Sequence, residues 1–302
     1  MFFKNLYFFR FSPKLAKSFA QIEQRLRDSP LKPVGPLELN SYGFVSPFGR
    51  DENVLSHQLG SAIWLTLGSE ERLLPAVVVN DALSKKISEV EQKEARTLGS
   101  KARMRIKEDI IHQLLPKAFV RPARLNASLD LKHGFLAVDC SSSKNAERFA
   151  SELRQALGSF PAVPLNAQSS VRAVLTAWIS GAALPTGLSL GEECELQDPA
   201  EQGAIIKCQR QELESAEIKK HLEAGKLVTR LALVFSDHIS FVLGDDLIVR
   251  KLKFLDAAIA DLEQQTTDSI RVELDARYAL FSAEIARLFV MLESAFKISK
   301  VE

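Results

Sequence analysis

Cysteine is scarce in this sequence, and its few occurrences form no recognisable pattern. The three cysteines stand far apart and include no C-x-x-C pair; they are Cys140, Cys194 and Cys208. An odd number at such spacing encodes neither a disulfide framework nor a zinc site. We therefore expect reduced thiols, as in proteins of the cytosol.

An excess of charge of one sign is missing too, because 39 Lys and Arg residues face 38 Asp and Glu residues. Net charge alone thus gives no reason to expect a polyanionic partner, and such a case must rest on where the charges lie. No apolar run approaches the roughly 20 residues of a membrane span. The N-terminal MFFKNLYFFRFSPK contains Lys4, Asn5 and Arg10 and lacks a small-residue cleavage site, so we expect a strand there and a soluble, cytoplasmic protein.

Motifs of nucleotide chemistry are also absent. The pair Gly225-Lys226 resembles part of a phosphate-binding loop, but Lys220 stands where that motif requires glycine. Leu227 stands where the motif requires serine or threonine. No G-x-G-x-x-G dinucleotide motif follows a predicted strand.

Metal-binding patterns are equally weak. No two histidines stand at i, i+4 around a carboxylate; the five are His57, His112, His133, His221 and His238. The pair Asp245-Asp246 could bind a cation, but a tight turn before a strand is favoured. We expect no metal and no cofactor, and no local pattern proposes a catalytic site, although distant residues could still assemble one.

The elements that are present predict an α+β protein with largely antiparallel sheets, long enough for two or three packed units. Helices are expected at 13–27, in one or two long helices over 80–113 with a bend at Gly99-Ser100, and at 143–158, 171–179 and 215–224. Strands are expected at 2–11, 44–45, 62–67, 123–131, 134–140, 162–165, 204–211, 227–235, 238–243 and 247–254. An acidic loop is expected around Glu192, Glu193, Glu195 and Asp198.

Apolar residues in the C-terminal segment alternate at spacings of four and three, which predicts a helix that packs along another helix. They are Leu274, Tyr278, Phe281, Ile285, Leu288, Leu292 and Ala295. The spacing leaves open whether the partner belongs to the same chain or to a second copy, and packing within the chain is favoured.

Basic residues gather in two places. Between Lys85 and Lys107, eight basic residues face three glutamates. A second group lies over 207–253, where Lys251 and Lys253 share one face of a predicted strand. The two groups indicate a surface for a phosphate backbone, with ordinary solvated faces as the equal alternative. No recognition helix, zinc finger or stacking motif is present, so contact through phosphates with little sequence preference is expected.

Several segments, in this order, resemble the RdgC family of recombination-associated proteins. They are FKNLYFFRF at 3–11, YGFVSPFG at 42–49, EERLLP at 70–75, IIHQLLPKAF at 110–119, GFLAVDC at 134–140, LRQALGSFPAVPL at 153–165, LEAGKLVTRLAL at 222–233 and LIVRKLKF at 247–254. The likeness runs from end to end. Departures at Phe9, Phe44 and Ser46 keep the aromatic or turn character.

The resemblance implies a nucleoid-associated, non-enzymatic protein that binds double-stranded DNA without marked sequence preference. Its horseshoe-shaped protomers would close into a homodimeric ring around the duplex and restrain RecA-dependent recombination and replication fork repair by occupying DNA. The implied domains are a central domain (1–76 and 120–167), a projecting helical tip (77–119) and a base domain with the C-terminal helix (168–302). The alternative is a protein-interaction scaffold that contacts a recombinase directly.

The resemblance also assigns residues. Those expected to contact DNA are Lys93, Arg96, Lys101, Arg103, Arg105, Lys107, Lys117, Phe119, Arg210, Gln211, Lys251 and Lys253. Those expected at the dimer interface are Ile110, Ile111, Leu114, Leu115 and Phe119. General burial frequencies alone would place Phe119 in a core.

Overall fold

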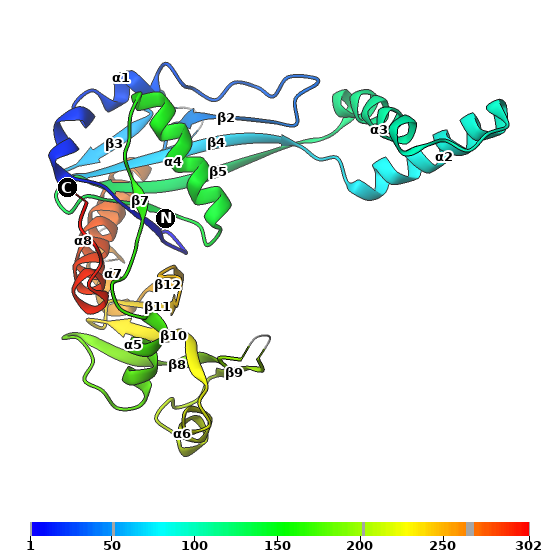
Figure 1. The fold of residues 1–302 in the computed structure, drawn as a ribbon. Coiled ribbons are helices and arrows are strands. Elements are labelled where there is room, and N and C mark those ends of the chain that lie inside the picture. Colours follow the sequence, from blue (N-terminus) through cyan, green and yellow to red (C-terminus); the bar gives the residue numbers. More distant parts are fainter. Residues whose placement is uncertain (1, 50–51, 201–202, 264–268, 302) are drawn as a thin grey trace. The chain divides into compact units, whose positions relative to one another are not determined.

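The computed structural model describes residues 2–49, 52–200, 203–263 and 269–301. The α+β class is confirmed, since helices accompany two sheets of antiparallel strands (Figure 1). The chain forms two compact units. Unit 1 comprises Met1–Asp28, Ser46–Thr66 and Leu125–Glu302, and unit 2 comprises Ser29–Val45 and Leu67–Arg124. The division into central, tip and base domains stays a prediction.

The first sheet has the strand order β2-β4-β5-β6-β1-β7, with β3 paired to β4. Its strands are β1 (Tyr7–Arg10), β2 (Asn40–Val45), β3 (Ser56–Leu59), β4 (Ala62–Arg72), β5 (Val120–Asp130), β6 (Phe135–Val138) and β7 (Val163–Pro164). The predicted N-terminal strand is confirmed only over its second half. In the β5–β6 turn, Gly134 has φ 69°, and a Cβ there would lie 2.4 Å from the carbonyl oxygen of Phe11, so glycine is required.

One long helix, α4 (Ser143–Leu157), contributes Phe149 and Leu153 to the core of unit 1. Ser142 caps its first turn by accepting a hydrogen bond from the backbone N–H of Asn145, and Gly158 ends it in the left-handed conformation. The single helix predicted over 13–27 is wrong. The segment instead forms a 3₁₀ turn, η1 (Pro13–Phe19), and a short α1 (Ile22–Leu26), because the core accepts only Phe19, Ile22 and Leu26 from it.

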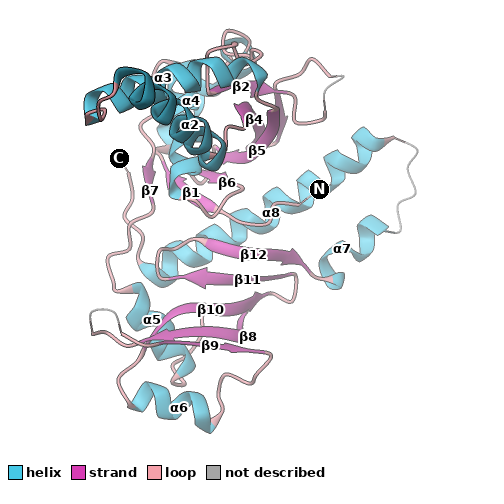
Figure 2. Ribbon diagram, turned by 90° about the vertical axis from the view of Figure 1, so that its right-hand side faces the viewer, coloured by secondary structure: helices cyan, strands magenta, loops and turns pink. Residues whose placement is uncertain are grey.

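The second sheet, in unit 1, has five strands in the order β12-β11-β10-β8-β9 (Figure 2). They are β8 (Leu188–Gln197), β9 (Ile205–Gln209), β10 (Leu227–Phe235), β11 (Ile239–Gly244) and β12 (Val249–Phe254). Helices α5 (Val171–Ile179) and α6 (Ala216–Glu223) lie where they were predicted. The predicted acidic loop is wrong: its three glutamates belong to β8, a strand in which Cys194 and Leu196 are buried.

The C-terminal helix α8 (Ile270–Phe296), preceded by α7 (Asp256–Glu263), packs within its own chain. Its regularly spaced apolar residues contact the sheets, so the prediction that this helix packs along another helix is wrong. The Phe289 ring stacks on Phe135 of β6 at 4.4 Å, and the Phe281 ring lies 6.2 Å from Phe254 of β12. Both sheets therefore share one aromatic core through α8.

Unit 2 carries a helical hairpin, formed by α2 (Ala76–Glu94) and α3 (Ser100–Leu114) and followed by the 3₁₀ turn η2 (Leu115–Lys117). The predicted bend is confirmed, because Gly99 is the N-cap of α3. At the root of the hairpin, the Arg72 guanidinium donates to the carbonyl oxygens of Gly35 and Leu115, both at 3.0 Å. This arginine adds a second hydrogen bond to the Leu115 carbonyl oxygen, which also accepts the backbone N–H of Ala118 at 3.1 Å.

Candidate nucleic-acid interface

A groove of about 560 Å³ crosses the outer face of the second sheet, with lining residues from all five strands or the turns beside them. Three predicted DNA-contacting residues line it: Arg210, Lys251 and Lys253. The acidic side chains Glu192 and Glu193 line it as well. The fold thus brings together cations that stand more than 40 residues apart in the sequence, within a hollow that also holds carboxylates.

A bulge in β12 turns consecutive basic residues outward. Opposite Phe241 of β11, β12 carries two residues, and the first of them, Lys251, has φ 53°. Val249 and Leu252 are buried on either side of the bulge, so Arg250 and Lys251 both face outward. Simple alternation predicted the shared face of Lys251 and Lys253 but not the outward turn of Arg250.

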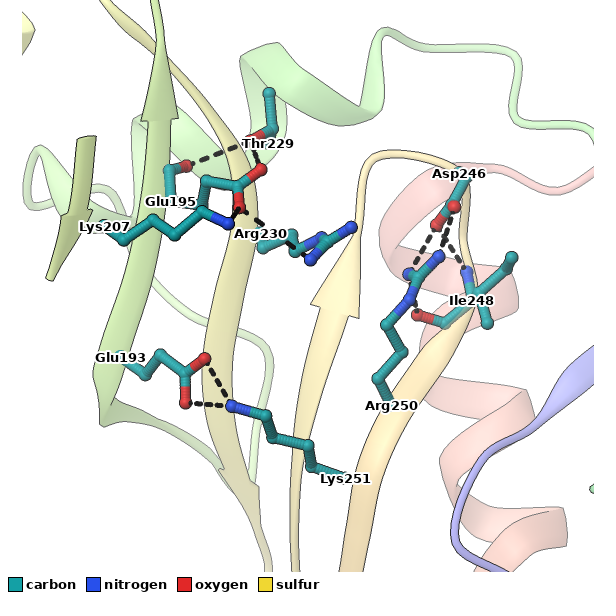
Figure 3. A network of polar contacts seen from close by, with 9 residues as sticks. All are labelled: Glu193, Glu195, Lys207, Thr229, Arg230, Asp246, Ile248, Arg250 and Lys251. Carbon is teal, nitrogen blue, oxygen red and sulfur yellow. Dashed lines mark hydrogen bonds and ion pairs between the residues drawn. The ribbon is translucent and has the colours of Figure 1, made fainter. Parts of the chain in front are cut away.

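Carboxylates of β8 neutralise part of this face (Figure 3). Lys251 Nζ lies 2.6 Å and 2.7 Å from the two carboxylate oxygens of Glu193. Glu195 accepts a hydrogen bond from the Thr229 hydroxyl at 3.0 Å and pairs with Lys207 at 3.3 Å and with Arg230 at 3.8 Å. The groove therefore contains its own counter-charges, which an incoming phosphate would have to displace.

Arg250 is held at the edge of this face by Asp246, with guanidinium to carboxylate distances of 2.9 Å and 2.6 Å. Burial is the largest single influence and would raise the pKa of Asp246, but the hydrogen bonds from Arg250 and the backbone, together with the charge of Arg250, outweigh it and the pKa is lowered. The same hydrogen bond raises the pKa of Arg250. Asp246 also accepts from the backbone N–H of Ile248, so this aspartate serves the turn, as its sequence context predicted.

The other predicted residues of this sheet differ in availability. Arg210 and Lys253 are exposed and form no ion pair with any residue the structure describes. Gln211 does not line the groove; its side-chain amide donates to Glu217 at 2.8 Å and to Ser215 at 3.4 Å. Arg210 has φ 56°, which places it at the sharp turn where β9 leads towards α6.

The hairpin of unit 2 presents a second set of predicted cations. Five of them are exposed and unpaired within the described part of the chain: Lys93, Lys101, Arg105, Lys107 and Lys117. The other two predicted cations of the hairpin already form ion pairs with glutamates. Arg96 pairs with Glu94 at 2.7 Å, and Arg103 reaches Glu91 on the opposite helix at 3.2 Å.

Glu91 is a structural residue of the hairpin that the sequence pattern did not reveal. Its carboxylate accepts the backbone N–H of Leu98 at 2.8 Å, which is the main cause of the lowered pKa of Glu91, and Arg103 adds to it. Arg103 also donates to the carbonyl oxygen of Leu98 at 3.0 Å. These contacts fix the hairpin turn and take Arg103 out of the free basic surface.

Burial divides the residues predicted for the dimer interface. Ile110 and Leu115 are buried inside unit 2, and Ile111 and Leu114 are half-buried, so they hold the hairpin together. Phe119 is 85% exposed, against the expectation from burial frequencies, and its carbonyl oxygen accepts from the backbone N–H of Leu73. Val77, at 79%, is also exposed near the root of the hairpin. The interface role of all five predicted residues stays a prediction.

One pattern associated with catalysis can be placed in the fold. The segment Gly187-Leu188-Ser189-Leu190-Gly191 spells G-x-S-x-G, but Ser189 lies inside β8 opposite Val234 and its hydroxyl donates to the Val234 carbonyl oxygen. A nucleophile elbow instead requires a sharp turn between strand and helix. Over residues 2–49, 52–200, 203–263 and 269–301, no group of three His, Cys, Asp or Glu side chains is arranged to hold a metal ion. No helix in these ranges is long and apolar enough to cross a membrane.

Comparison with known proteins links the chain to one family. A family model described as "Putative exonuclease, RdgC" matches residues 1–299. The "Recombination-associated protein RdgC" of Xanthomonas axonopodis pv. citri (strain 306) is 60% identical over 303 residues, and that of Stenotrophomonas maltophilia (strain R551-3) is 57% identical over 303 residues. Both alignments cover 100% of this chain and 100% of the relative.

Proposed function

The chain belongs to the RdgC family, and from this premise we propose that it binds double-stranded DNA without marked sequence preference and restrains RecA-dependent recombination by occupying DNA. The observation that carries the proposal is the groove in which Arg210, Lys251 and Lys253 gather on one open sheet face. The names of its relatives connect them with recombination.

The chemistry of the groove favours a phosphate backbone over base edges. Lysine and arginine side chains that neutralise phosphates release condensed counterions, so affinity falls linearly with salt on logarithmic axes. A sheet face that carries lysine and arginine side chains offers no helix to insert into the major groove, where bases are distinguished. Contacts of this kind position a duplex without selecting its sequence.

We further propose the assembly that the family resemblance implies: a horseshoe-shaped protomer, two of which close into a homodimeric ring around DNA in the nucleoid. The net charge of +1 is compatible with such a ring, since basic residues can line the hole while acidic residues cover the outside. Exposed Phe119 and Val77 supply apolar surface for one of the contacts between protomers. Two-fold symmetry would make each contact self-complementary.

The family description includes the word exonuclease, whereas we propose that the protein occupies DNA and does not cut it. Incubation of the purified protein with end-labelled linear duplex and either Mg²⁺ or Mn²⁺ tests this part. Intact labelled strands after prolonged incubation are expected. Progressive shortening that follows the protein through purification would overturn the non-enzymatic assignment.

The central experiment compares salt-dependent DNA binding of the wild type with Lys251→Glu/Lys253→Glu. We expect a steep linear slope of log K against log salt for the wild type, equal for unrelated sequences, and a slope smaller by about 1 for the variant, because Lys253 is free whereas Lys251 is already paired with Glu193. Lys14→Glu/Lys144→Glu is the matched control, because both lysines are exposed, outside the groove, and carry the same charge change. Equal loss in both variants would show that the groove has no special role.

A second candidate function is a scaffold that contacts a recombinase directly. The observation that favours it is the exposed apolar surface at Phe119 and Val77, which suits a protein partner as well as a second copy. Strand-exchange assays separate the two functions. Inhibition that survives Lys251→Glu/Lys253→Glu would favour the scaffold, and inhibition lost together with DNA affinity would favour DNA occupancy.

A further inference from the structure

Two of the three cysteines, far apart in sequence, face each other across neighbouring strands. In the antiparallel β8–β9 pair, Cys194 stands directly opposite Cys208. Residues opposed in this way have Cα atoms about 4.5–5.5 Å apart and side chains on the same face. Disulfides span Cα separations of about 4.4–6.8 Å, so the backbone already satisfies the distance requirement. The two thiols are free, and Cys208 is close enough to help raise the pKa of Cys194.

We propose that Cys194 and Cys208 form a reversible disulfide when the protein encounters a peroxide. The Cys208 sulfur attacks one oxygen of the peroxide, becomes a sulfenic acid and releases water. The Cys194 sulfur then bonds to the Cys208 sulfur, and a second water leaves with the sulfenic oxygen and the thiol proton. The two thiols together lose two electrons and two protons, and the peroxide is reduced to two waters; an external dithiol reverses the reaction.

The order of attack follows from accessibility. Cys208 is partly exposed on the edge strand β9, whereas Cys194 is buried on β8. Burial, with a contribution from Cys208, raises the pKa of Cys194 to about 12, so this thiol has little thiolate with which to meet an oxidant first. It suits the second step, in which the sulfenic acid is already beside it.

The third cysteine provides an internal reference. Cys140 is buried, and burial raises the pKa of its thiol to about 11. Its sulfur donates to the Ser142 carbonyl oxygen at 3.5 Å, and it faces no other cysteine across a strand pair. We therefore expect Cys140 to stay reduced under conditions that join the other two.

The bond would lie beside the basic face without belonging to it. Side chains alternate along a strand, so the neighbours of the two cysteines point to the opposite face. Glu193, Glu195, Lys207 and Gln209 line a second, smaller hollow of about 170 Å³ on that face. Joining Cys194 to Cys208 would pin the edge strand β9 to β8 and restrict the part of the groove that Arg210 occupies. Disulfide formation itself does not depend on DNA binding; only this consequence rests on the proposed function.

The test treats the full-length protein with hydrogen peroxide, quenches with an alkylating agent and counts free thiols after denaturation. We expect the three thiols to fall to one, and peptide mapping without reductant to join the Cys194 and Cys208 peptides within one chain. Dithiothreitol should restore all three. Cys140→Ser should still lose two thiols, whereas Cys194→Ser and Cys208→Ser should form no such bond.

Two outcomes would overturn the proposal: three thiols that persist after oxidation, or a bond between Cys208 residues of two chains on a non-reducing gel. Melting temperature supplies a readout separate from thiol counting, because a bond that closes the 194–208 loop should raise it by several degrees in the wild type and not in Cys208→Ser. DNA affinity, measured before and after oxidation, then tests only the proposed effect on the groove.

Discussion

At the scale of single residues, the groove contains cations that attract phosphate and carboxylates that neutralise some of these cations. Lys251 of β12 is bound by Glu193 of β8, across the two strands that separate them, so it is positioned but not free. A phosphate must compete with that carboxylate and approach it closely. The acidic residue therefore sets how strongly the cation beside it can contribute to binding.

Glu193→Gln should raise affinity for duplex DNA by about two- to fivefold at low salt, the range expected for one exposed ion pair. The salt slope should become steeper by about 1, since one more cation is available for phosphate. Fluorescence anisotropy over a salt series measures both quantities. Glu147→Gln, an exposed carboxylate on α4 outside the groove, is the control and should change neither. Unchanged binding by Glu193→Gln would mean that Lys251 is not a DNA contact.

At this scale, the sequence could predict which face of β12 carries the charges, because Lys251 and Lys253 alternate with Leu252 and Phe254. It could not predict that Lys251 adopts φ 53° or that Arg250 turns outward beside it. Both depend on a bulge that is defined by pairing with β11. The partner Glu193 was missed because β8 was interpreted as a loop.

At the scale of elements, the helix ends marked by capping residues were the features that the sequence predicted most accurately. The helix at 143–157 has a serine cap and a terminal glycine, and the hairpin bend has Gly99, so both were found from the sequence. Strand β8 was missed because its many glutamates give it the composition of a loop. Only the alternation of outward glutamates with the buried Cys194 and Leu196 marks it as a strand. The segment 13–27 has good helix composition, but its apolar residues fit the core only as two short pieces.

On the hairpin, α3 carries Lys101 and Arg105 one turn apart, both exposed and free of ion pairs among the described residues. Lys101→Glu/Arg105→Glu should lower affinity for all duplex sequences alike, by about tenfold or more, and reduce the salt slope by about 2. Anisotropy titrations on two unrelated duplexes measure this, with Lys14→Glu/Lys144→Glu as the matched control. A loss confined to one of the two sequences would contradict contact through phosphates.

The helix α8 offers a test of the shared core. Phe289 is fully buried and packs on Phe135 and Phe8, so Phe289→Ala should cost about 3–5 kcal/mol of the free energy of unfolding. Its neighbour Val290 is 44% exposed, and Val290→Ala should cost less than about 1 kcal/mol. Urea unfolding followed by circular dichroism measures both. Similar losses in the two variants would show that the aromatic core is not the main source of stability here.

At the scale of the whole molecule, the proposed ring predicts topological retention. A closed dimer can leave a linear duplex by sliding off its end, whereas release from a circle requires a contact between protomers to open. We expect slower dissociation from closed-circular than from linear DNA of equal length at high salt, with a dimer mass by light scattering. Linearising the circle with a restriction enzyme should restore fast release. Equal rates on both substrates would contradict encirclement.

The N-terminal strand finds its partners late in the chain. Residues of β1 pair with β6, Leu6 bridges to Val249, and the Phe3 ring packs on Phe281 of α8. Unit 2, in contrast, draws only on residues up to Arg124. During synthesis on the ribosome, unit 2 can thus fold before the segments that pack against the aromatic β1 have been translated. A segment translated early is therefore among the last to be covered, and its exposed aromatic residues would offer a binding site to chaperones that hold nascent chains.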